Sequence, residues 1–181
     1  MNRRRRTDCR FRTLKLEKTY TKRSLVDEIT HKAVAGSSYE VTKSAILGPF
    51  FRHDTPPTAN DANIVLKKPD DGEMVYMHGI VRDATTDKPI AGAKVDIWQC
   101  STNGLYEQQD PDQPEFNLRG NLTTDENGYY GLYCLRPTAY PVPDDGPAGQ
   151  LLHMLDRHPY RPAHIHVIVC LPIPYVWRLG E

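Results

Sequence analysis

The chain has 181 residues, enough for one domain with a substantial hydrophobic core but not for two. Lys and Arg number 23, as do Asp and Glu, so no net charge favours binding to nucleic acid or a membrane. No apolar run approaches the ~20 residues that span a bilayer, and the N-terminus lacks the apolar stretch of a secretory signal. The four cysteines are scattered, without C-x-x-C spacing. We therefore expect free thiols and a cytoplasmic protein.

The N-terminal part offers little regular pattern before residue 24. The basic run Arg3–Arg6 is expected to be a solvated end of the chain rather than a nucleic-acid element. From Ser24, the text S-L-V-D-E-I-T-H-K predicts one short helix, with Ser24 as its N-cap. Fifteen prolines and twelve glycines stand mostly between short apolar runs, which favours strands and turns in the rest of the chain.

Strand patterns occupy the middle of the chain. Residues 76–83 and 93–98 read as a pair of strands, and the second has Val95 and Ile97 alternating with Lys94, Asp96 and Trp98, as on a sheet with one buried face. Asn127-Gly128 is a hairpin signal ahead of a strand over 129–135. Many β-sandwich modules without catalytic activity share these patterns, so they indicate a fold and say little about function.

A histidine pair follows in Arg161-Pro162-Ala163-His164-Ile165-His166, which leads into an apolar, β-branched run. We predict a strand over 161–169, in which His164 and His166 project from one face and could chelate a metal. Two ordinary half-buried histidines are the alternative. Zinc is the competing metal, although the cysteines are not spaced for it.

The segment from Tyr140 to His166 resembles the iron site of the intradiol ring-cleavage dioxygenases, the family of catechol and hydroxyquinol 1,2-dioxygenases. That family has a Tyr before a Pro- and Gly-rich loop and then R-P-A-H-x-H. An earlier family tyrosine, after a strand ending in Trp and an N-G-x-Y motif, matches Tyr106. The resemblance runs from about residue 25 to residue 169.

The resemblance implies a mainly β protein. Residues 1–50 would be an N-terminal arm with a short helical linker remnant, and residues 51–181 a β-sandwich catalytic domain. Family members continue well beyond the position of Val169, so we expect a chain truncated at both ends. Lost strands would leave sheet edges unpaired, which puts stability in doubt. Homodimer formation through the linker stays open, because little of that linker is recognisable.

The resemblance also implies a site. Fe(III) would be bound by Tyr106, Tyr140, His164 and His166. Tyr140 would leave the metal and act as a base, and Arg161 would stabilise negative charge on the substrate ring. Ile46, Gly48 and Pro49 would wall the substrate pocket. The alternatives are a Gly-Pro turn that only packs aromatic neighbours, and an arginine that only contacts a surface anion.

The implied function is cleavage of a catechol-type diol, hydroxyquinol or catechol, with O2 to a muconate-type dicarboxylic acid, in aromatic catabolism. The loop over 140–149, together with 157–160, looks more like hydroxyquinol and fungal-type enzymes. His153 and His158 are interpreted as loop residues, not ligands. The alternative function is a non-catalytic β-sandwich binding module or an inactive truncated paralogue.

Overall fold

A computed structural model describes residues 14–16, 47–83, 86–142 and 144–172. The helix predicted from Ser24, the basic run at the N-terminus and Ile46 lie outside these ranges. Of the predicted arm over 1–50, residues 14–16 and 47–50 are described. Residues 14–16 form a strand, which the aperiodic local sequence did not predict.

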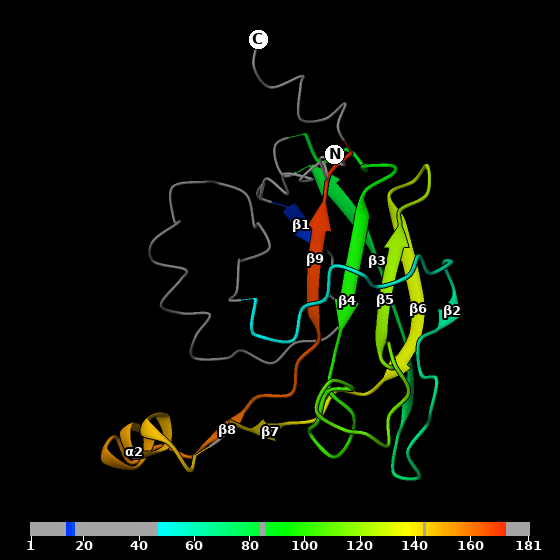
Figure 1. The fold of residues 1–181 in the computed structure, drawn as a ribbon. Helices are drawn as coiled ribbons and strands as arrows, with labels where there is room; N and C mark the ends of the chain where they lie inside the picture. The colour runs from blue at the N-terminus through cyan, green and yellow to red at the C-terminus, as the bar shows by residue number, and fades with distance from the viewer. Residues whose placement is uncertain (1–13, 17–46, 84–85, 143, 173–181) are drawn as a thin grey trace, which may run out of the picture.

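Two sheets pack face to face (Figure 1). The first has the order β1-β3-β6-β2, from strands β1 (Leu14–Leu16), β3 (Met74–Asp83), β6 (Tyr129–Leu135) and β2 (Ala62–Asn63). The second has the order β5-β4-β9, from strands β5 (Arg119–Thr123), β4 (Lys94–Trp98) and β9 (His166–Cys170). Neighbouring strands are antiparallel except β2, which runs parallel to β6.

The core lies between the two sheets. In β4, Val95 and Ile97 are buried against the other sheet, while Trp98 belongs to a second cluster with Tyr106. Both sheets contribute to the central cluster, which includes Val81, Val95, Ile97, Leu122, Leu132 and Cys134. Burying one such aliphatic side chain contributes on the order of 1.5–3 kcal/mol. The predicted β-sandwich is therefore confirmed.

The positions of these strands in the sequence were predicted correctly, but the strands with which they pair were not. The segments 76–83 and 93–98 form β3 and β4, but these strands belong to different sheets. The Asn127-Gly128 turn does not make a hairpin either, because it leads from β5 in one sheet to β6 in the other. Gly128 has φ +72°, and a Cβ there would lie 2.7 Å from the Val81 carbonyl oxygen. The turn residues set a tight local bend, and packing against β3 sets the partner of β6.

The predicted continuous strand over 161–169 is interrupted. Arg161 ends the short strand β8 (Tyr160–Arg161), four residues follow without regular structure, and β9 begins at His166. Pro162 explains the break, because proline has no amide hydrogen to donate to a sheet. His164 therefore lies just before the strand that was expected to carry it.

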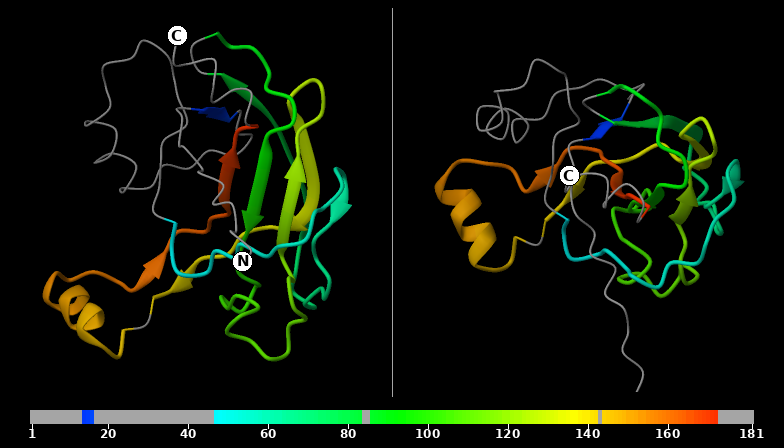
Figure 2. Two further views of the ribbon diagram at one scale, coloured as in Figure 1. Left: turned by 45° about the horizontal axis from the view of Figure 1, so that its top comes forward. Right: turned by 90° about the horizontal axis from the view of Figure 1, so that it is seen from above.

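A long connection, residues 136–165, projects from the sandwich and joins β6 to β9. The two-residue strand β7 (Tyr140–Pro141) pairs with β8, and between them lies the helix α2 (Pro147–Met154). The views in Figures 1 and 2 show α2 standing to one side of the sandwich. This helix was not predicted, although Pro147 in its first turn is a typical start signal. His153 belongs to α2 and not to a loop, and His158 follows the helix.

The cysteines differ from one another. Cys100 and Cys134 are buried and free, as expected, whereas Cys170 is disulfide-bonded, so the expectation of free thiols is wrong there. Sequence spacing cannot reveal a bridge that depends on tertiary proximity.

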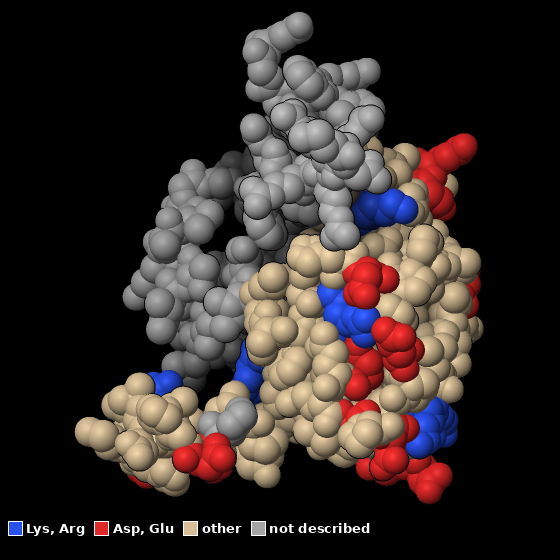
Figure 3. Space-filling model, viewed as in Figure 1, with Lys and Arg blue, Asp and Glu red and all other residues tan. Residues whose placement is uncertain are grey.

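No helix among the described residues has the length and apolar character needed to cross a bilayer. On the described part of the face in Figure 3, acidic and basic side chains are interspersed.

Candidate metal centre

Four different pieces of backbone supply the predicted ligands. Tyr106 comes from the loop between β4 and β5, and Tyr140 begins β7. His164 lies in the irregular segment after β8, and His166 begins β9, directly opposite Trp98 of β4. These residues span sixty positions of sequence, so only the tertiary fold can bring them together.

The structure does bring the four rings together in a closed circuit. The ring centroids of Tyr106 and Tyr140 lie 5.9 Å apart, and those of Tyr140 and His164 lie 5.4 Å apart. His164 and His166 follow at 4.8 Å, and His166 returns to Tyr106 at 6.5 Å. Each ring is therefore the neighbour of the next, as a shared metal would require.

Two polar atoms in this circuit are buried without a hydrogen-bond partner in the described part of the chain: the Tyr106 hydroxyl and Nε2 of His164. His164 Nδ1 lies 2.6 Å from the Pro162 carbonyl oxygen. A carbonyl only accepts, so Nδ1 carries the hydrogen and Nε2 keeps a free lone pair. Buried polar atoms normally have a partner, and a bound ion is one explanation when they have none.

The electrostatics keep the imidazoles neutral. Burial, followed by the neighbouring His164 and Arg161, lowers the pKa of His166 to about 4. Burial also lowers the pKa of His164. The hydrogen bond to the Pro162 carbonyl partly opposes this change, and the charge of Arg161 adds to it. Burial raises the pKa of Tyr106, and the adjacent Tyr140 hydroxyl adds to it. Neutral imidazoles are the form that binds a metal, and a cation at this position would offset the cost of a buried phenolate.

Arg161 lies beside one of the phenols. Its Nη1 donates a hydrogen bond of 2.7 Å to the Tyr140 hydroxyl, across the β7–β8 pair in which the two residues are direct partners. Its guanidinium carbon is 5.6 Å from the Tyr140 ring centroid. The cation is thus placed at the oxygen of one predicted ligand.

The predicted pocket wall is described in part. Gly48, with φ +74°, lies against His166, since a Cβ there would be 3.7 Å from the His166 Cε1 atom. Pro49 is exposed in the turn that follows. Phe50 stacks on Tyr106, with centroids 4.3 Å apart and planes 18° apart. Gly48 and Phe50 thus contact two of the predicted ligands, while a role of this segment in walling a substrate pocket stays a prediction.

Trp98 is a contributor that the sequence analysis missed. Its ring stacks on His166 at 4.8 Å with planes 3° apart, and Phe51 packs against it at 5.2 Å. Trp98 is 2% exposed, so it fixes the plane of the imidazole. The available sequence signal was that a large apolar side chain occupies a β4 position that alternation directs away from the sandwich core.

The donor types suit ferric iron. Two phenolates are hard, anionic oxygen ligands, and imidazole is a borderline donor, a combination that favours Fe(III) over Zn²⁺. Among the described residues no three His, Cys, Asp or Glu side chains are grouped to hold a metal. The residues present in the circuit fit an iron with mixed tyrosine and histidine ligands.

Comparison with known proteins agrees with the family resemblance of the sequence. A family model described as "Dioxygenase" matches residues 46–174. The chain is 46% identical over 149 residues to the intradiol ring-cleavage dioxygenase prcA of Aspergillus niger, across 82% of this chain and 47% of that protein. This chain belongs to the intradiol ring-cleavage dioxygenase family.

Two further relatives of this intradiol dioxygenase-family chain are named for their substrates. It is 48% identical over 150 residues to a catechol 1,2-dioxygenase of Candida albicans, covering 82% of this chain and 48% of the relative. The crystal structure of hydroxyquinol 1,2-dioxygenase from Pseudomonas putida DLL-E4 superposes with a TM-score of 0.70 and 38% identity, over 82% of this chain and 49% of that one. The chain spans about half the length of the relatives it matches.

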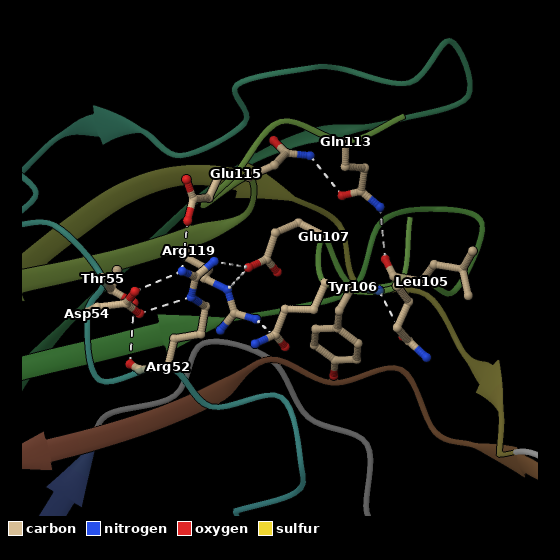
Figure 4. A network of polar contacts seen from close by, with 12 residues as sticks. Arg52, Asp54, Thr55, Leu105, Tyr106, Glu107, Gln113, Glu115 and Arg119 are labelled. Carbon is tan, nitrogen blue, oxygen red and sulfur yellow. Dashed lines mark hydrogen bonds and ion pairs between the residues drawn. The ribbon is translucent and has the colours of Figure 1, made fainter. Parts of the chain in front are cut away.

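In this family member, a charged network lies beside the loop that carries Tyr106 (Figure 4). Glu107 accepts hydrogen bonds from Arg119 Nε at 2.6 Å and from Arg52 Nη1 at 3.3 Å. The Glu107 and Arg119 side chains are 3% and 2% exposed. Tyr106 itself is held at its backbone amide, which donates to the Gln109 side chain at 3.1 Å. The loop is thus restrained on both sides of the phenol.

Proposed function

We propose that this chain carries the catalytic centre of a ferric-iron-dependent intradiol dioxygenase, with residues 51–181 as its catalytic domain. The reaction would cleave a catechol-type diol, hydroxyquinol or catechol, with O2 to a muconate-type dicarboxylic acid. The observation that carries this proposal is the circuit of four rings, in which the Tyr106 hydroxyl and His164 Nε2 are buried without a hydrogen-bond partner among the described residues.

The proposed ligands are Tyr106, Tyr140, His164 and His166. His164 would bind through Nε2, because Nδ1 donates to the Pro162 carbonyl. The stacking of Trp98 would hold the His166 ring in a fixed plane. When bound, Fe(III) would supply a Lewis acid that draws electron density from a coordinated diol and makes its ring carbon reactive toward O2.

The proposed acid–base chemistry centres on Tyr140. Its hydroxyl oxygen accepts the Arg161 hydrogen bond at 2.7 Å, so the guanidinium holds this oxygen in place and remains in contact with it. We propose that this oxygen takes a proton from the incoming diol. Arg161 then stays beside the reacting group with a charge that is independent of proton transfer, and stabilises the negative charge that develops on the ring.

The proposed substrate class, a catechol-type diol, rests on the names of two relatives. The Candida albicans relative is named for catechol and the Pseudomonas putida structure for hydroxyquinol. We propose that Ile46, Gly48 and Pro49 wall the diol pocket. The contact of Gly48 with His166 supports this placement.

The test is to load the 181-residue chain with Fe(III) and to record its visible absorption and its oxygen uptake with catechol and with hydroxyquinol. A tyrosinate-to-iron charge-transfer band and uptake with either diol are expected. Tyr140→Phe should keep iron, change the band and lose most turnover, while Tyr133→Phe, an exposed tyrosine of β6, should match the parent. Iron binding without uptake of oxygen would favour the non-catalytic binding module.

A further inference from the structure

We propose that Arg52 is a positioning residue for the diol: it tethers the segment 47–55 across the metal centre by binding Glu107, the residue next to Tyr106. The inference rests on the proposed function and extends it. It concerns a residue that would contact neither metal nor substrate, and that acts through the segment in which it lies.

Arg52 lies at the junction of three carboxylates (Figure 4). Its guanidinium binds Asp54 through Nε at 3.0 Å and Nη2 at 2.8 Å. Nη2 also binds Glu115 at 2.9 Å, and Nη1 reaches Glu107 at 3.3 Å. The guanidinium carbon lies 4.1 Å from the Phe116 ring centroid. These contacts use the planar fork of arginine, which a lysine ammonium cannot reproduce.

Glu107 is a fixed anchor for this tether. Its side chain is 3% exposed and is held by Arg119, which is 2% exposed, through a contact of 2.6 Å. Arg119 also donates to Gln108 at 3.1 Å. Glu107 therefore keeps a buried partner when Arg52 is removed, and no buried charge is left alone. Replacing Arg52 consequently tests the tether without dismantling the anchor.

The tethered segment needs such a restraint because residues 47–55 contain no helix or strand. It nevertheless contacts two of the proposed ligands and the tryptophan that stacks on one of them. Gly48 lies against His166, Phe50 stacks on Tyr106, and Phe51 packs on Trp98. Arg52 directly follows Phe51, so its contacts with Glu107 and Glu115 determine how closely this segment lies over the rings.

The experiment compares Arg52→Gln with Arg136→Gln. The control removes an arginine whose ion pair with Glu73 is exposed, at 71% and 61%, and involves neither segment 47–55 nor the Tyr106 loop. Ferric protein is titrated anaerobically with catechol, and steady-state oxygen uptake is measured on the same samples. For Arg52→Gln we expect the Kd and KM for catechol to rise about tenfold, with kcat within about twofold, as for lost ground-state binding. Arg52→Lys should recover part of the affinity.

A second readout needs no iron. Hydrogen exchange of the iron-free chain should rise several-fold in peptides covering 47–55 for Arg52→Gln and stay parental for Arg136→Gln. Parental exchange and parental catechol affinity in Arg52→Gln would overturn the inference. So would loss of iron or of kcat with an unchanged KM. A parent that shows neither the charge-transfer band nor oxygen uptake would instead overturn the proposed function, with the exchange result still reporting on the tether.

Discussion

Replacing Tyr106 with Phe should stabilise the iron-free chain and weaken the iron-loaded one. The substitution removes a single oxygen from a ring that is 1% exposed. The stack on Phe50, at 4.3 Å, and the edge contact with Tyr140 do not depend on that oxygen. The hydroxyl is buried without a hydrogen bond of ordinary geometry in the described part of the chain, and the Tyr140 hydroxyl affects its pKa less than burial does. In the iron-free protein the substitution therefore removes mainly the desolvation cost of this oxygen.

The magnitude follows from that cost. A buried polar group without a partner costs about 1–3 kcal/mol, so Tyr106→Phe should raise the free energy of unfolding of the iron-free chain by ~1–2 kcal/mol. For a chain of this size that corresponds to a rise in melting temperature of roughly 2–8 °C. With Fe(III) present the sign reverses, because a lost ligand lowers iron affinity and with it the stabilisation that binding confers.

Chemical denaturation with and without Fe(III) measures both effects. Tyr133→Phe, on an exposed position of β6, is the matched control and should change stability by less than about 0.5 kcal/mol in either condition. A loss of more than about 1 kcal/mol for iron-free Tyr106→Phe would mean that the hydroxyl makes a stabilising contact. Equal iron affinity in parent and variant would remove Tyr106 from the ligand set.

Other predictions concern the arginine, a glycine and a thiol. Arg161→Ala should retain iron and lose about 10²–10³ in kcat, because we propose that its charge acts on the transition state; near-parental oxygen uptake would contradict this. Gly104→Ala should destabilise by ~1–3 kcal/mol in denaturant melts, since Gly104 has φ +80° and the new methyl would lie 2.9 Å from the Tyr140 Cβ; parental stability would show that Tyr140 can shift freely. Burial raises the pKa of Cys134 to about 11, so iodoacetamide at pH 8 should label it only after unfolding. Because burial disfavours the thiolate, Cys134 leaves the free energy of unfolding independent of pH below about pH 8.5 and lowers it as pH rises from there toward 11; labelling of Cys134 in the folded chain at pH 8 would refute the shift.

The local order of residues in the sequence was sufficient for strands β3, β4 and β6 and for the identity of the candidate ligands. Alternation in β4 placed Val95 and Ile97 in the core, because side chains in a strand alternate between its faces with a period of two. The strand over 129–135 was predicted with its observed bounds. The motifs around Tyr106 and His166 indicated the family because each is a short, contiguous pattern.

The tertiary structure decided which strands pair and what surrounds the ligands. Asn127-Gly128 sets a bend but not a partner, because the choice of partner depends on packing between distant segments. Pro162 divides the expected strand, and β8 then pairs with β7 so that Arg161 reaches Tyr140. The Nδ1 tautomer of His164 depends on a carbonyl two residues away whose direction no pattern encodes. Arg52 meets Glu107 across fifty-five positions of sequence, and contacts at that separation arise only when the folded backbone makes them close.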